Sequence, residues 1–102
     1  MAQSPINIVY STEVHPTVLL PSFGHLTYVV EKTLEEAKVD ATVEWEILKR
    51  MNSHEPTIAL SLTDGATDKS VRGGFELREL KDEPMFVLAV RSLVMELARM
   101  TR

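Results

Sequence analysis

The sequence predicts an α+β fold, in which two helices cover one face of a four-stranded, mostly antiparallel sheet in a two-layer sandwich. The elements follow the order β-α-β-β-β-α. One observation is the alternation of apolar and other residues, with a period of two, between residues 43 and 77. Another is the pair of flanking stretches, in which apolar residues recur about every 3.6 positions. The length of 102 residues predicts a single domain over 1–102.

Residues 6–38 predict the first strand and the first helix. Ile6, Ile8 and Tyr10 share one face of a short β-branched segment, which indicates a strand. Ser22 fits an N-cap, and the helix after it ends near Lys38. Its expected core stripe is Phe23, Leu26, Val29, Val30, Leu34 and Ala37. Its expected solvent side includes Thr27, Glu31, Glu35 and Glu36.

Three more strands are predicted, over 43–48, 57–63 and 71–78. Burial sets their register, because a slip of one residue would expose a whole apolar row. The expected apolar pairs are Ile47–Ile58, Trp45–Leu60, Val43–Leu62, Leu62–Val71, Leu60–Gly73 and Ile58–Phe75. All of these side chains then share one side of the sheet.

The last helix is predicted to begin after Asp82, with Pro84 in its first turn, and to run to about Met100. Its core-facing arc is Phe86, Ala89, Val90, Leu93, Val94 and Leu97.

The outward arc of this helix is the most informative feature for function. Apolar residues project into it between polar ones, and the predicted partner interface is Met85, Leu88, Arg91, Ser92, Met95 and Arg99. Methionine packs adaptably, which suits a contact surface. The alternatives are scattered surface apolar residues, which are normal, or a stripe covered by residues 14–21.

The sheet face opposite the helices offers a second candidate surface. A platform is predicted from Glu44, Glu46, Ala59, Ser61, Arg72 and Gly74. Glycine in a strand often marks the close approach of another backbone or a ligand. The alternative, which we favour, is an ordinary solvated face with cross-strand ion pairs.

Composition excludes several classes of function. The chain has no cysteine, so disulfides, thiolate metal sites and cysteine nucleophiles are excluded, and a reducing, cytoplasmic location is expected. The net charge of −4 disfavours nucleic acid as a partner. No apolar run approaches the roughly 20 residues that span a bilayer, and no secretory signal is recognisable, so no membrane association is expected.

Catalytic signals are poor, so an enzymatic role is disfavoured and the catalytic residues stay unknown. The chain has no Gly-x-Ser-x-Gly elbow. Glu13 and His15 would share a face of an extended segment, but His25 and His54 have no spacing that completes a set of three or four ligands. No metal and no cofactor are therefore expected.

The predicted element order resembles that of double-stranded-RNA-binding domains and of the ribosome-binding domain of bacterial hibernation factors. This resemblance covers most of the chain as topology, without a shared motif. It implies an RNA- or ribosome-associated domain, for which the chain's arginines would have to cluster. They are Arg50, Arg72, Arg78, Arg91, Arg99 and Arg102.

The favoured expectation is a non-enzymatic protein–protein interaction or assembly module that associates with itself, or with another protein, through its last helix. A symmetric pair is the commonest closed assembly. An RNA- or ribosome-associated domain, and a small ligand-binding or enzymatic domain that uses the open sheet face, are the two alternatives.

Overall fold

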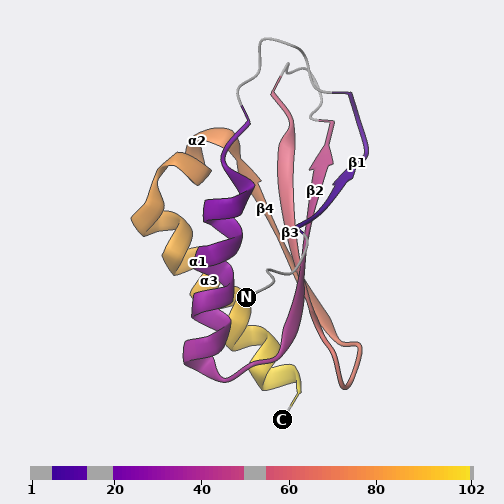
Figure 1. The fold of residues 1–102 in the computed structure, drawn as a ribbon, viewed down its shortest axis with the longest axis vertical. Helices are drawn as coiled ribbons and strands as arrows, with labels where there is room; N and C mark the ends of the chain where they lie inside the picture. The colour runs from indigo at the N-terminus through magenta and orange to yellow at the C-terminus, as the bar shows by residue number, and fades with distance from the viewer. Residues whose placement is uncertain (1–5, 14–19, 50–54, 102) are drawn as a thin grey trace.

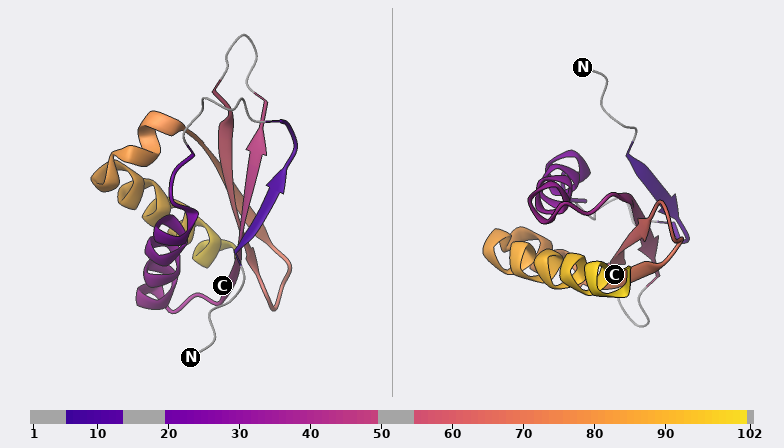
Figure 2. Two further views of the ribbon diagram at one scale, coloured as in Figure 1. Left: turned by 45° about the horizontal axis from the view of Figure 1, so that its top comes forward. Right: turned by 90° about the horizontal axis from the view of Figure 1, so that it is seen from below.

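A computed structural model, which describes residues 6–13, 20–49 and 55–101, has the α+β fold expected from the sequence. Four strands form one sheet in the order β1-β2-β3-β4, and the helices lie together on one side of it (Figures 1 and 2). The strands are β1 (Asn7–Tyr10), β2 (Ala41–Leu48), β3 (Thr57–Asp64) and β4 (Ser70–Glu76). The helices are α1 (Phe23–Ala37), α2 (Leu77–Lys81) and α3 (Glu83–Met100).

Strand pairing follows the predicted register. β2 pairs antiparallel with β3, where Trp45 lies opposite Leu60. β3 pairs antiparallel with β4, where Leu60 lies opposite Gly73 and Ile58 lies opposite Phe75. β1 pairs parallel with β2, and α1 is the crossover that a parallel connection requires. The expectation of a mostly antiparallel sheet is confirmed.

The core lies between the sheet and the helices, around the fully buried ring of Trp45. The Trp45 ring centroid is 5.4 Å from that of Phe23 on α1 and 6.4 Å from that of Phe86 on α3. Phe75 of β4 contacts Phe86 edge-on, at a centroid distance of 5.5 Å. One aromatic cluster therefore joins both long helices to two strands.

The buried indole explains why the predicted position of Thr27 is wrong. Thr27 was expected on the solvent side of α1, but it is only 8% exposed. The indole Nε1–H of Trp45 donates a 2.8 Å hydrogen bond to Thr27 Oγ1. A buried indole N–H needs an acceptor, and the α1 hydroxyl supplies it.

The last strand ends earlier than predicted, at Glu76. The described residues form three helices where two were expected. Leu77 and Arg78 belong to the short helix α2. A capping box starts this helix. The Glu76 side chain accepts the backbone N–H of Glu79, and the Glu79 side chain accepts the backbone N–H of Glu76. The helical turn buries Leu77 together with Leu80, which an extended chain would place on opposite faces.

The boundaries of α1 and α3 agree with the predicted capping residues. Ser22 Oγ accepts the backbone N–H of His25, and Asp82 Oδ1 accepts that of Met85. α1 ends at Lys38, whose φ of 58° is left-handed. Ala37, expected in the core stripe, is instead exposed at the last position of α1.

Replacing Thr27 with valine should destabilise the fold by about 1–3 kcal/mol, because it leaves the Trp45 N–H buried without an acceptor. Thr33→Val is a matched control on the same helix. The hydroxyl of Thr33 is also buried, but it donates to the backbone oxygen of Val29 within α1. Denaturant unfolding, followed by the fluorescence of the single tryptophan, measures both variants. Equal losses in the two variants would contradict the role given to Thr27.

The β3–β4 turn contains a carboxylate whose ionised form is stabilised. Asp64 Oδ2 accepts hydrogen bonds from the Thr67 hydroxyl at 2.8 Å and from the backbone N–H groups of Thr67 and Ala66 at 2.8 and 3.2 Å. These bonds, led by the Thr67 hydroxyl, lower the pKa of Asp64 below its usual 3.8.

Because the pKa of Asp64 is lowered on folding, its carboxylate stabilises the fold above pH 3.8, and this contribution disappears as the pH falls through the lowered pKa. The difference in unfolding free energy between the wild type and Asp64→Asn should therefore shrink as the pH falls below 3.8. Denaturant unfolding across that range measures it, with Asp68→Asn as the control in the same turn. A difference that stays constant down to the lowest pH would refute the assignment.

Candidate functional site

The outward face of α3 carries three exposed apolar side chains. Met85, Leu88 and Met95 are 52%, 63% and 65% exposed. The opposite face of the helix is fixed in the core by Phe86 and Val90, together with Val94 and Leu97. Because one face is locked against the sheet, the rotation of α3 about its axis is set and the apolar side chains point to solvent. We call Met85, Leu88 and Met95 the α3 stripe.

Polar residues flank the α3 stripe as the sequence predicts. Arg91, Ser92 and Arg99 are exposed, and so is Glu96. The Ser92 hydroxyl donates to the backbone oxygen of Leu88 at 3.2 Å, within the helix itself. Burying Ser92 in a contact would therefore leave no unsatisfied hydroxyl donor.

The residues of the predicted sheet platform lie on one face, and their exposure and pairing differ. Arg72 pairs with Glu46, which also accepts the hydroxyl of Ser11. Ala59 is 2% exposed beneath its neighbours, whereas Glu44 is exposed and Ser61 is half-buried. Arg72–Glu46 is thus a cross-strand ion pair on this face.

Gly74 belongs to the predicted platform, and no neighbouring atom lies close enough to exclude a side chain at this position. A Cβ added at Gly74 would lie 3.7 Å from Thr57, an ordinary contact. A Cβ at Gly73 would lie 2.9 Å from the Leu93 side chain of α3. A glycine in this strand was expected to mark the close approach of another group. In the structure this glycine is Gly73, and the approaching group is Leu93 of α3, on the core side of the sheet.

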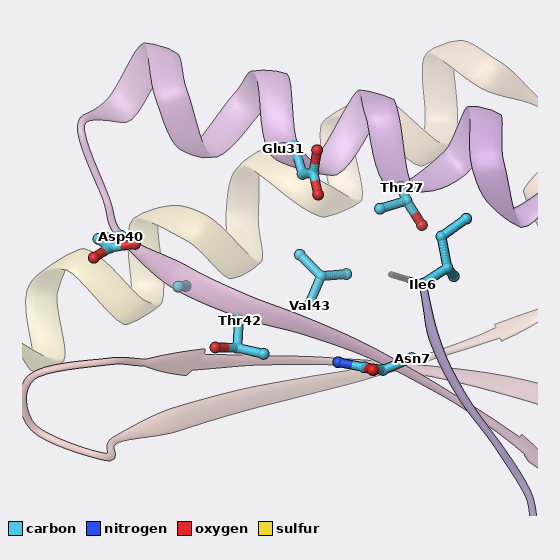
Figure 3. Close-up of a pocket in the computed structure, with 8 residues that line it drawn as sticks. Ile6, Asn7, Thr27, Glu31, Asp40, Thr42 and Val43 are labelled. Atoms are coloured by element: carbon cyan, nitrogen blue, oxygen red, sulfur yellow. The ribbon is translucent and has the colours of Figure 1, made fainter. Parts of the chain in front are cut away.

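Sequence reasoning missed an acidic hollow of about 270 Å³ between α1, β1 and β2 (Figure 3). Glu31 points from α1 toward β2, and Asp40 lies where that strand begins (Figure 3). Asn7, Thr27 and Thr42 also line it. The parallel pairing of β1 with β2 brings these residues together, and no local sequence pattern indicates it.

A second missed hollow, of about 370 Å³, lies where α2 meets α3. It is lined by Glu76, Arg78, Glu79, Asp82 and Met85. Arg78 pairs with Glu76 at 2.7 Å, so the three carboxylates leave a net negative charge beside the first turn of α3. Part of this region was predicted as a strand, so the sequence did not indicate the hollow.

The histidines do not assemble a metal centre in the described part of the chain. His25 Nε2 lies 2.8 Å from Glu83 Oε1, where it joins the first turns of α1 and α3. His15 and His54 lie outside the described residues. Among residues 6–13, 20–49 and 55–101, no three histidine, aspartate or glutamate side chains gather closely enough to hold a metal ion.

The described arginines do not gather on one surface. Arg72 lies on the open sheet face and Arg78 on α2, each in an ion pair, whereas Arg91 and Arg99 lie on α3. Arg50 and Arg102 lie outside the described residues. This distribution gives no support to the RNA-binding alternative.

Within the same described ranges, none of the helices has the length and apolar character needed to traverse a bilayer.

Comparisons with protein-family models, with curated proteins and with solved structures find no match to this chain. Function must therefore be inferred from the surfaces that the fold presents.

Proposed function

We propose that this domain is a non-enzymatic interaction module that associates with a second copy of itself through the α3 stripe. The single observation that carries the proposal is the alignment of three large apolar side chains, each more than half exposed, along one face of the longest helix. Apolar side chains gathered on one exposed face favour a protein contact.

Methionine and leucine suit such a contact chemically. Full burial of an exposed Leu or Met side chain contributes about 1.5–3 kcal/mol, and these side chains, which are 52–65% exposed, can contribute only part of that. The flexible thioether of methionine fits an imperfect surface. The α3 stripe supplies three such residues from each copy. Three residues are far fewer than the roughly 20–30 that each partner contributes to a standard interface, so we expect reversible, concentration-dependent association.

The open sheet face supports a ligand-binding role less well. Its central charges, Arg72 and Glu46, already neutralise one another. The acidic hollow beneath α1 is lined by the carboxylates of Glu31 and Asp40, and among the described residues no three histidine, aspartate or glutamate side chains gather there. No reaction can be written for either surface from the residues present.

Leu88→Glu should shift the protein toward the monomer, because a buried carboxylate opposes desolvation of the stripe. Light scattering at tens of micromolar, over a dilution series, measures the mass. Combining Leu88→Glu with Met95→Glu should abolish association. Both positions are exposed, so circular dichroism should show an unchanged fold.

The matched control is Tyr28→Glu, on the exposed side of α1. Tyr28 is 60% exposed, close to the 63% of Leu88, and its replacement adds the same charge. Tyr28→Glu should retain the mass of the wild type. A wild type that is monomeric at tens of micromolar, or equal effects of the two substitutions, would overturn the proposal.

A further inference from the structure

We infer that Met85 and Met95 form a modification site on the surface of α3, at which a peroxide converts both thioethers to sulfoxides and makes this face of the helix polar. The reaction needs only solvent access to the two side chains, which are 52% and 65% exposed. Its effect on self-association rests on the proposed function, in which reversible pairing leaves free copies for the oxidant to reach.

The methionines of residues 6–13, 20–49 and 55–101 all lie on α3, at Met85, Met95 and Met100. The other two, Met1 and Met51, lie outside the described residues. Methionine often fills gaps inside protein cores. Here the buried apolar residues are phenylalanine, leucine, isoleucine, valine, tryptophan and alanine. The described part of the chain thus carries its methionines on the surface of one helix.

Thioethers are the only sulfur groups that this chain offers to an oxidant, because it contains no cysteine. An accessible thiolate would otherwise compete for the peroxide. The indole of Trp45, another readily oxidised group, is fully buried. Met100 is 36% exposed, which is less than Met85 or Met95. Among the described methionines, Met85 and Met95 should therefore react before Met100.

The reaction transfers one oxygen atom from hydrogen peroxide to the sulfur. A sulfur lone pair attacks the peroxide, the O–O bond breaks as the S–O bond forms, and a proton moves to the departing hydroxide, so that water leaves. The sulfur loses two electrons and the peroxide gains them. The product is a polar, chiral sulfoxide. Methionine sulfoxide reductases remove the oxygen as water while two thiols become a disulfide, so the site has two interconvertible states.

The way α3 is anchored allows this change of polarity without unfolding. Phe86, Val90 and Val94 hold the helix in the core from its opposite face, and each is at most 1% exposed. The buried core cluster contains no methionine. Oxidation at Met85 and Met95 therefore adds a solvated oxygen outside the core, whereas a sulfoxide inside a core would disrupt its packing.

The experiment treats the wild-type protein with hydrogen peroxide and follows each methionine by peptide mapping with mass spectrometry. Met85 and Met95 should be oxidised faster than Met100. Hydrophobic interaction chromatography should show earlier elution of the oxidised protein, because the α3 stripe has become more polar. Circular dichroism and the denaturant midpoint should stay unchanged. Treatment with a methionine sulfoxide reductase and a dithiol should restore the original elution.

The matched control is the double variant Met85→Leu, Met95→Leu, which keeps two apolar, helix-favouring side chains but removes both sulfur atoms. It retains the other three of the five methionines, so any shift in elution that peroxide still causes belongs to those. Peroxide should leave its elution unchanged. The double variant Met85→Gln, Met95→Gln should elute early without peroxide, because its side chains are polar at the same two positions.

The outcomes separate this inference from the proposed function. Equal oxidation rates at Met85, Met95 and Met100, an equal elution shift in the leucine variant, or loss of the fold on oxidation would overturn the modification site. Light scattering tests its effect on association, because peroxide should shift the wild type, but not the leucine variant, toward the monomer. A dimer unaffected by full oxidation of both residues would overturn that effect. A wild type that is monomeric before oxidation would overturn the proposed function alone.

Discussion

The burial of one indole ring organises this fold. Trp45 is the only tryptophan of the chain and is fully enclosed, so its N–H requires a partner inside the protein. The hydroxyl of Thr27 meets that need, which fixes α1 over β2 in both position and rotation. Phe86 stacks near the same ring, which fixes the first half of α3. The positions of the two long helices therefore both depend on one side chain of the sheet.

The packing of α3 against the sheet also determines which of its side chains are exposed to solvent. α3 lies close to β4, because Gly73 has no side chain to hold the Leu93 methyl groups away. At its far end, the Lys69 ammonium donates to the backbone oxygen of Met100 at 2.6 Å, which joins the last turn of α3 to the segment before β4. These contacts at the start, the middle and the end of α3 hold the helix with Leu88 and Met95 exposed.

Sequence periodicity predicted the strands and helices that have one apolar and one polar face. It did not predict features that depend on contacts between residues far apart in the chain. The register around Trp45 could be predicted because any slip would expose its whole row. The burial of Thr27 could not, since threonine on a helix next to glutamates resembles a solvated position until the indole is placed. α2 was missed because Leu77 continues the alternation of β4, and only the Glu76–Glu79 capping box ends it. The two acidic hollows arise from residues brought together by the fold, which no local pattern encodes.

The apolar residues of the α3 stripe lie largely outside the core. Glutamate, lysine and glutamine are good helix formers and would serve equally well at positions 88 and 95, where the side chain contributes little to the core. Leu88 and Met95 instead leave apolar surface in water, directly opposite the residues that anchor the helix. Between them, the Ser92 hydroxyl is satisfied within α3, where it donates to the backbone oxygen of Leu88. The proposed association through α3 would remove this apolar surface from water.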